Sequence, residues 1–440
     1  MTTTKKIGPF LAALLVAGNM IGSGVYLLPA TLASVGSSSV LSWLAATAGG
    51  LVLAGAFALL AMLRPTVNGI ATYAGDGLGR PFGFASSMAY WVSSWVGNVA
   101  IALAVVGYLA VFVPALKGPV ATTAAAIGAM WLLAGANLLG PRLVARLSGL
   151  TLLIGLLPIL AVIVLGAIDF DPQVFTGSWN PSGKPLGQII PASVVPVFWA
   201  FLGFESANVA AAAVRDPQRD IPKAALGGVA LAAVVYMAAT VAIMGIIPAG
   251  ELATSTAPFA DAVTRLAGPT IGGAVAVCAL VKAIGTLGGW ILVAAETNRA
   301  TAAEGFLPRA ISEVEPSRTP VRDILVTTAL MTVAAVLSAS PTLGEQFEVL
   351  INVSTVLFMV VYGLCALALV RFASAIAQPG PRWGARLLAL AGALFSAWAI
   401  AASDPDLLKV TGVVLLATTP LWAISALTRR RAATVAEQSL

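Results

Sequence analysis

Long apolar segments alternate with short polar connections along almost the whole chain. Twelve of the segments are long enough to cross a bilayer as a helix, which takes about 20 mostly apolar residues. They run over 7–32, 39–63, 82–114, 119–140, 147–168, 189–214, 224–248, 268–298, 322–339, 344–370, 384–402 and 408–428. The pattern predicts an all-α membrane protein of twelve transmembrane helices, followed by a tail at 429–440.

The first apolar segment is interrupted near its centre. Residues 18–24 read Gly-Asn-Met-Ile-Gly-Ser-Gly, and each glycine costs a helix interior about 1 kcal/mol relative to alanine. Backbone that leaves the helix at bilayer depth must be buried in protein or line a cavity, because unpaired N–H and C=O groups are costly in lipid. We therefore expect a deliberate break in this helix.

The sixth segment is interrupted in a similar way, at Trp199-Ala-Phe-Leu-Gly-Phe-Glu-Ser206. Two broken helices in corresponding positions of successive five-helix units are typical of an inverted-topology repeat that holds a substrate between the breaks. We therefore predict a first repeat at 7–168, a second repeat at 189–370 and two further helices within 384–428.

Composition agrees with a membrane protein. Of the 440 residues, 59% are hydrophobic and only 10% are charged, and the mean hydropathy is +0.95, which excludes an ordinary soluble domain. Of the 24 Lys and Arg residues, Lys117, Lys184, Arg265 and Lys409 lie in predicted outer loops, Lys282 lies inside a span and the other 19 lie in predicted inner segments. This bias predicts cytoplasmic termini and accounts for the net charge of +6 without a nucleic-acid partner.

The two breaks predict complementary halves of a binding site. N–H groups freed at Ile21 to Gly24, next to the positive end of a half-helix, favour a carboxylate, and the Ser23 hydroxyl is a further donor. Carbonyl groups freed around 200–203 are suited to an ammonium group. Together they predict a clamp for the head group of an α-amino acid; the alternative is a helix kinked only for packing.

Glu205 and Trp290 extend this site. Glu205 is the only carboxylate deep within the first six spans. Because an ionised glutamate is expensive in hydrocarbon, it is either a proton carrier or a structural group bonded to nearby backbone. Trp290 follows two glycines at mid-span and predicts a cation–π platform for guanidinium or ammonium, unless it only fills the core.

Lys282 lies halfway along the eighth span, too far from either end to reach water easily. Glu348, in the tenth span, is its possible counter-ion, and both a coupling role and a structural ion pair stay open. The chain has no histidine, and Cys278 and Cys365 lack metal-ligand spacing. We therefore predict no metal, no cofactor and no enzyme activity.

Several stretches together resemble the amino acid–polyamine–organocation superfamily, and within its basic amino acid/polyamine antiporter group they are most similar to the bacterial arginine/agmatine antiporters. The stretches are residues 18–29, 90–98, 199–207, 216–222 and 285–290, together with Tyr362. The resemblance implies a leucine-transporter-like fold in a bacterial cytoplasmic membrane, with a homodimer as a plausible assembly.

The resemblance also implies roles for individual residues. The substrate carboxylate is expected at Ile21, Gly22, Ser23 and Gly24, beside Asn19, and its amino group near Trp199 and Leu202. The substrate side chain is expected to pass Ser93, Ser94, Asn98 and Ser354 and to end on Trp290, with Trp199 as outer gate and Glu205 as the buried carboxylate.

We therefore expect a secondary transporter that works by alternating access and exchanges an arginine-like amino acid for its agmatine-like amine. The resembling antiporters have small neutral residues at the positions of Lys282 and Glu348. This difference keeps an alternative open, a proton-coupled symporter of neutral or small amino acids in which Lys282 acts as the coupling cation. A channel, which needs a continuous polar stripe, and a sensor with a soluble domain fit the sequence less well.

Overall fold

The computed structural model describes residues 8–65, 70–139, 141–206, 216–312, 319–425 and 427. These residues form α-helices and short 3-10 helices, with no β-strand among them. Within this part of the chain, nine helices are long and apolar enough to cross a membrane, and Pro9–Met20 and Leu186–Phe201 are shorter apolar helices. With the 17-residue helix α15 (Val321–Leu337), these elements account for the twelve predicted spans and confirm an all-α membrane protein.

Most ends of the uninterrupted spans lie within a few residues of the predicted ends of the apolar segments. They are α3 (Ser39–Leu63), α5 (Arg80–Leu109), α6 (Pro119–Leu138), α7 (Pro141–Ile168), α11 (Pro217–Ile246), α14 (Pro269–Glu304), α15, α16 (Leu343–Phe372), α17 (Pro379–Ala401) and α18 (Pro405–Leu416). Many begin with proline in the first turn, where its missing N–H is no loss. Short helices α4 (Thr72–Leu78), α8 (Pro172–Gly177), α12 (Ala249–Leu252) and α13 (Pro258–Ala267) lie in connections.

The first and sixth spans are both interrupted, as predicted. The first consists of α1 (Pro9–Met20) and, after the break, the 3-10 helix η1 (Ser23–Tyr26), the short α2 (Leu28–Thr31) and the 3-10 helix η2 (Leu32–Ser34). The expected half-helix is therefore a series of short helices and not one continuous α-helix. The sixth begins with α9 (Leu186–Phe198), η5 (Trp199–Phe201) and η6 (Phe204–Ser206). Its remainder, 207–215, lies outside the described residues, as do Lys5, Lys6 and the tail at 429–440.

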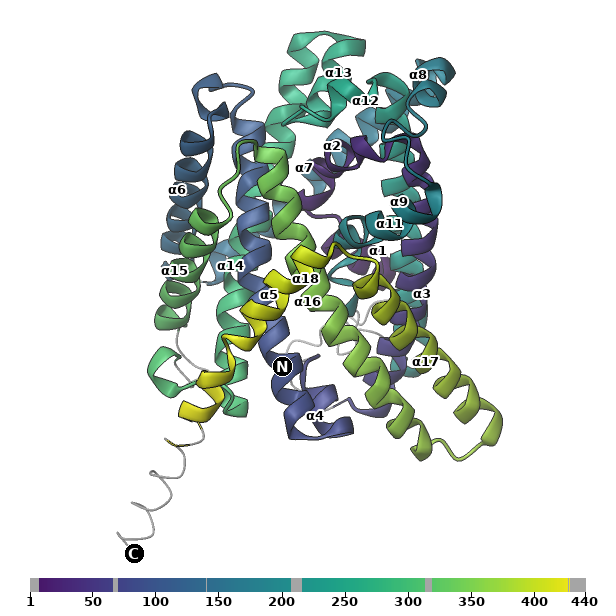
Figure 1. Cartoon of the computed structure of the whole chain (residues 1–440), viewed down its shortest axis with the longest axis vertical. Coiled ribbons are helices and arrows are strands. Elements are labelled where there is room, and N and C mark those ends of the chain that lie inside the picture. Colours follow the sequence, from purple (N-terminus) through teal and green to yellow (C-terminus); the bar gives the residue numbers. More distant parts are fainter. Residues whose placement is uncertain are drawn as a thin grey trace, which may run out of the picture.

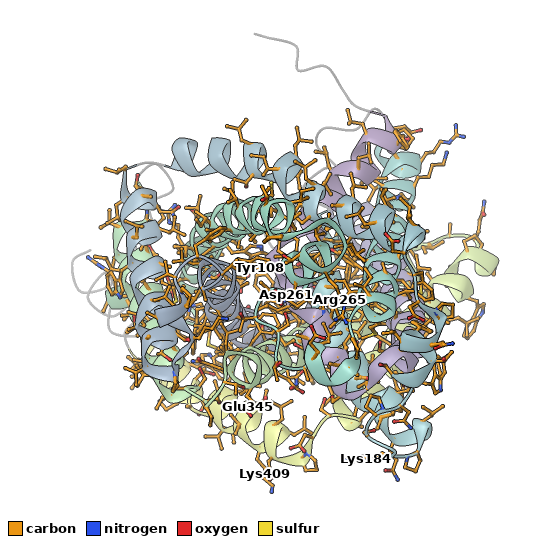
Figure 2. The ribbon with its side chains drawn as sticks, turned by 90° about the horizontal axis from the view of Figure 1, so that it is seen from above. Tyr108, Lys184, Asp261, Arg265, Glu345 and Lys409 are labelled. Carbon is orange, nitrogen blue, oxygen red and sulfur yellow. The ribbon has the colours of Figure 1, made fainter. Side chains whose placement is uncertain are left out.

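The connections sort to two ends of the helix bundle. Figure 1 shows α8, α12 and α13 at one end and α4 at the other, in agreement with the predicted alternation of outer and inner loops. Figure 2 looks onto the end that carries α13 with Arg265, one of the four predicted outer cations. We call this the predicted outer end and the end with α4 the predicted inner end.

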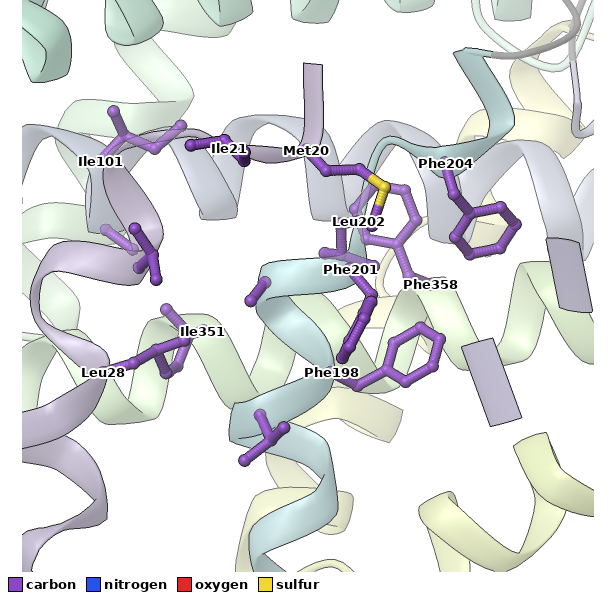
Figure 3. Close-up of a cluster of buried hydrophobic side chains, with 14 of the residues drawn as sticks. Met20, Ile21, Leu28, Ile101, Phe198, Phe201, Leu202, Phe204, Ile351 and Phe358 are labelled. Carbon is purple, nitrogen blue, oxygen red and sulfur yellow. The ribbon is translucent and has the colours of Figure 1, made fainter. Parts of the chain in front are cut away.

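Helix α5 is central and α18 is peripheral. In the most apolar 18 residues of each span, 89% are buried within the protein in the span of α5, against 11% in the span that begins with α18. Helix α18 crosses the outside of α5 and α16 (Figure 1). Helix α5 packs against both α14 and α16. Both breaks are embedded in buried apolar side chains, including Met20, Phe201 and Phe358 (Figure 3), which hold the broken backbone in place.

Candidate functional site

The first break leaves fewer free amides than the sequence suggested. The Ile21 N–H donates to the Ala17 carbonyl at 2.8 Å and the Gly22 N–H donates to the Met20 carbonyl at 2.6 Å. Helix η1 then starts at Ser23, and the first N–H groups of a helix have no partner within it. The predicted anion donors therefore narrow to the amides of Ser23 and Gly24. The Ser23 hydroxyl lies outside the described side chains.

The second break lies directly against the first. Gly203 has φ of 104°, in the left-handed region that glycine alone adopts readily, so this residue explains why the helix stops here. A Cβ at Gly203 would lie 3.6 Å from the carbonyl oxygen of Asn19. The two interruptions thus meet in space, although they are far apart in the sequence.

A small cavity of about 50 Å³ lies between the breaks, α5, α14 and α16. Ten of the residues predicted for the site line it: Asn19, Gly22, Gly24, Ser93, Ser94, Asn98, Trp199, Leu202, Trp290 and Ser354. Of the other predicted residues, Ile21 is buried without lining the cavity, and Glu205, Lys282 and Glu348 lie elsewhere. The structure therefore brings most of the predicted site together.

The polar groups of this cavity offer mainly acceptors. Its three serine hydroxyls donate to main-chain oxygens at 2.7–2.9 Å, Ser93 to Tyr90, Ser94 to Trp91 and Ser354 to Ser93. The Asn98 amide nitrogen donates to the Trp290 carbonyl at 3.1 Å, whereas its side-chain oxygen is buried with no partner among the described residues. Because the hydroxyl protons are engaged, the serines offer a ligand only lone pairs. Such a lining is suited to a cationic, donor-rich group.

The Trp199 indole fills the space between the first break and α5. A Cβ at Gly24 would overlap Nε1 of the ring and lie 2.9 Å from its Cδ1, and a Cβ at Gly97 would lie 2.9 Å from its Cη2. Glycine at both positions is therefore required for the indole to lie where it does. Gly97 was not predicted from the sequence, since nothing local marks it as a contact of Trp199.

Aromatic side chains pack around Tyr26 of η1, which follows the first break. The Tyr26 hydroxyl donates to the Gly155 carbonyl at 2.5 Å. The Tyr26 ring packs edge-on against Tyr108 and Phe259, with centroids 5.6 and 5.4 Å apart. Since Phe259 belongs to α13, at the outer end in Figure 1, these contacts close the path on that side.

A much larger cavity of about 1120 Å³ lies on the other side of the small one, and we call it the vestibule. It follows α14 from Lys282 to Glu304 and reaches Thr72 and Tyr73 of α4, at the predicted inner end. Asn19, Gly22, Thr286 and Trp290 line both cavities. The site is therefore accessible from the end with α4 and closed at the opposite end.

Glu205 lines the vestibule and not the small cavity. Its carboxylate accepts a hydrogen bond from the Tyr362 hydroxyl at 2.8 Å and another from the Gly203 N–H at 3.1 Å. These bonds join the second break to α16. The sequence marked Tyr362 only through the family resemblance, whereas the structure makes it the main side-chain partner of Glu205.

Lys282 and Glu348 do not form the ion pair that the sequence suggested. The methylene chain of Lys282 covers Gly155 of α7, where an added Cβ would lie 2.7 Å from its Cδ and 2.8 Å from its Cβ. Glu348 is exposed on α16, and the three salt bridges among the described residues involve other side chains. Helix α5 packs against both α14 and α16, which the sequence did not reveal.

The sequence interpretation also missed Thr286. This residue lies one helical turn from both Lys282 and Trp290 and lines both cavities. Its hydroxyl is buried with no hydrogen-bond partner among the described residues. The signal that would have found it is the i, i+4, i+8 spacing of residues 282, 286 and 290, which places the three on one helix face.

Comparison with known proteins gives consistent results. The family model described as amino acid permease matches residues 7–423. The putrescine transporter PotE of Escherichia coli K12 is 34% identical over 412 residues, which cover 93% of this chain and 94% of that protein. The cadaverine/lysine antiporter of the same strain is 33% identical over 377 residues, covering 84% of this chain and 85% of that protein. PotE of Haemophilus influenzae is 32% identical over 413 residues, covering 93% and 95%.

Proposed function

Because the chain belongs to the amino acid permease family, in the basic amino acid/polyamine antiporter group of its superfamily, we propose that it exchanges a cationic amino acid such as arginine for the corresponding decarboxylated amine. Like its relatives, the chain is a membrane transporter and not an enzyme. The exchange works by alternating access, in which the two ends of the bundle open in turn around one site.

The lining of the small cavity carries this proposal. We expect the amides of Ser23 and Gly24, at the start of η1, to bind the carboxylate, and the Asn98 oxygen with the serine lone pairs to accept bonds from a cationic side chain. The half-buried face of Trp290 borders the same space, where a guanidinium or ammonium group gains cation–π stabilisation of about 0.5–2 kcal/mol.

The names of the relatives support the same substrate class. One is a putrescine transporter and another is a cadaverine/lysine antiporter, so a diamine is named in both and a basic amino acid in one. We extend this class to the present chain, with arginine and agmatine as the first pair to test.

Counterflow in proteoliposomes tests the proposal directly. Vesicles preloaded with agmatine, cadaverine or putrescine should take up labelled arginine, lysine or ornithine much faster than unloaded vesicles. The pair with the highest rate identifies the preferred substrates. If no preloaded amine or amino acid accelerates uptake at any pH between 5 and 8, the proposed exchange is wrong.

Replacing Trp290 with leucine should weaken binding of arginine by roughly 2- to 30-fold, because the cation–π contact is lost while an apolar side chain is kept. Trp290→Phe should lose less, since a smaller aromatic face remains. Binding to purified protein by calorimetry measures both. Equal affinity in wild type and Trp290→Leu would contradict the platform.

A proton-coupled symporter of neutral or small amino acids is the second candidate. Lys282 supports it, because a buried cation near the first break can substitute for a coupling ion. Under this alternative an imposed inward proton gradient drives uptake of alanine into unloaded vesicles, and Lys282→Ala removes the pH dependence. Under the exchange proposal, Lys282→Ala changes substrate range but leaves uptake dependent on the preloaded amine.

A further inference from the structure

Two polar side chains on one face of α14, those of Lys282 and Thr286, have no hydrogen-bond or ion-pair partner among the described residues. The side chains of Lys282 and Thr286 are 6% and 8% exposed, and they are one helical turn apart. No hydrogen bond or salt bridge joins the Lys282 ammonium or the Thr286 hydroxyl to another described side chain or main-chain group. Both side chains line the vestibule beside Gly18 and Asn19 of α1.

The carboxylates that line the vestibule are engaged elsewhere. Glu205 is bonded to Tyr362 and Gly203. Glu296 pairs with Arg299 at 3.4 Å, and Glu304 accepts hydrogen bonds from Thr72 and Ser87. None of them lies within salt-bridge distance of Lys282. The carbonyl end of α1 offers only about half a negative charge, so a full positive charge at Lys282 has no full counter-charge among the described residues.

We propose that Lys282 and Thr286 form a carboxylate station at the deep end of the vestibule, beside the first break, which binds the carboxylate of an α-amino acid when the amides of that break release it. The inference rests on the proposed exchange and deepens it by assigning the step that separates amino acid from amine. Thr286 borders both cavities, and Lys282 lies one turn before it on α14, about 5–6 Å away toward the predicted outer end. A carboxylate released by the amides of the first break therefore has a donor and a counter-charge within one short step.

The station discriminates between the two exchanged substrates by charge. An amino acid presents a carboxylate to Lys282, and the ammonium attracts it. The decarboxylated amine has no carboxylate and carries an additional net positive charge, so the same ammonium repels it. Lys282 therefore favours the amino acid at a site where the rest of the lining accepts both substrates.

Lysine and cadaverine test this inference, since they differ only in the carboxylate. Their affinities are measured by calorimetry on purified full-length protein in chloride-free buffer. Lys282→Met keeps the length of the side chain and removes its charge. We expect it to weaken lysine binding at least about tenfold, as for a hydrogen bond to a charged group, and to leave cadaverine binding unchanged or tighter. Thr286→Val should weaken lysine a few-fold, whereas Thr286→Ser should not.

Equal weakening of lysine and cadaverine in Lys282→Met would overturn the station, and so would unchanged binding of lysine. Lys409→Met, in an exposed ion pair with Asp406 in the first turns of α18, is the matched control and should bind both ligands as wild type does. If Lys282→Met does not fold, the Thr286→Val and Thr286→Ser pair decides, because both keep the charge.

Two further comparisons show whether the station binds the substrate carboxylate or a chloride ion, and whether a negative result concerns the station or the proposed function. If inorganic chloride occupies the station, adding chloride will weaken lysine binding in wild type but not in Lys282→Met. Chloride bound there will also tighten cadaverine binding. Tighter cadaverine binding in chloride would overturn a station reserved for the substrate carboxylate. If wild type binds none of the amino acids or amines, the proposed function itself is wrong. If wild type binds both and Lys282→Met affects them equally, only the station is wrong.

Discussion

Replacing Gly24 with alanine is expected to reduce exchange about a hundredfold, near the upper end of the penalties for overpacking a well-packed site. The new methyl group would overlap the indole nitrogen of Trp199, so the ring could not close the small cavity. Since alternating access requires that closure, the transport rate should fall even where the protein still inserts and folds. Initial rates of counterflow in proteoliposomes measure the effect.

The control for this prediction is Gly128→Ala on α6, where an added Cβ meets nothing within 4 Å. This variant should transport at the wild-type rate. Partial recovery is expected in the double variant Gly24→Ala with Trp199→Phe, because the smaller ring leaves room for the methyl group. A wild-type rate for Gly24→Ala alone would show that Trp199 does not need this position during the cycle.

Replacing Glu205 with leucine is expected to reduce both transport and thermal stability strongly. The Gly203 N–H and the Tyr362 hydroxyl would lose their acceptor inside the protein, and each buried unsatisfied group costs about 1–3 kcal/mol. The lost hydrogen bonds would be those that hold the second break. A decrease in transport of tenfold or more and a lower melting temperature should therefore occur together. Counterflow rates and thermal unfolding of the purified protein measure the two effects.

Glu205→Gln separates the two roles that the sequence left open. The amide keeps an acceptor oxygen for Tyr362 and Gly203 but cannot exchange a proton. If Glu205 is structural, Glu205→Gln retains most of the transport rate and the wild-type pH profile, and Tyr362→Phe shows a milder loss than Glu205→Leu. If Glu205 carries the coupled proton, Glu205→Gln transports without pH dependence or not at all, which favours the symporter.

The structure corresponds to one state of the proposed transport cycle, in which the small cavity is closed toward one end of the bundle and open toward the other. Trp199 and the Tyr26 aromatic contacts close the path toward the predicted outer end, while the vestibule leads from Trp290 to the predicted inner end. In this state Thr286 borders both cavities, and Lys282 lies at the deep end of the vestibule, two turns from Trp290 on the side of the predicted outer end. The two residues thus lie beside the first break, where the proposed station would act.

Most of the fold could be predicted from the chain because its causes are local. Apolar length defines a span, and the observed α3 has the predicted bounds of 39–63. The two breaks were predictable for the same reason, since Gly22, Gly24 and Gly203 are unfavourable within a helix wherever it packs. Ten of the residues predicted for the site line one cavity.

The parts that could not be predicted depend on contacts between distant segments. The Ile21 and Gly22 amides were expected to be free, yet the chain turns so that both find carbonyl partners. Lys282 was matched with Glu348 because both are unusual in a span, but α14 packs its Lys282 face on α7. Neither Thr286 nor Gly97 stands out in the sequence, since their significance lies in what they face.

The sequence by itself thus determined the membrane class, the twelve spans and the positions of both interruptions, because transfer of apolar side chains into lipid and helix propensity act residue by residue along the chain. Only the tertiary structure decided which polar groups are paired: Glu205 with Tyr362, the serines with main-chain oxygens, and Lys282 and Thr286 with no described group. The physical reason is that a hydrogen bond or ion pair needs its partner within a few ångströms, and that distance is set by how helices far apart in the sequence pack together.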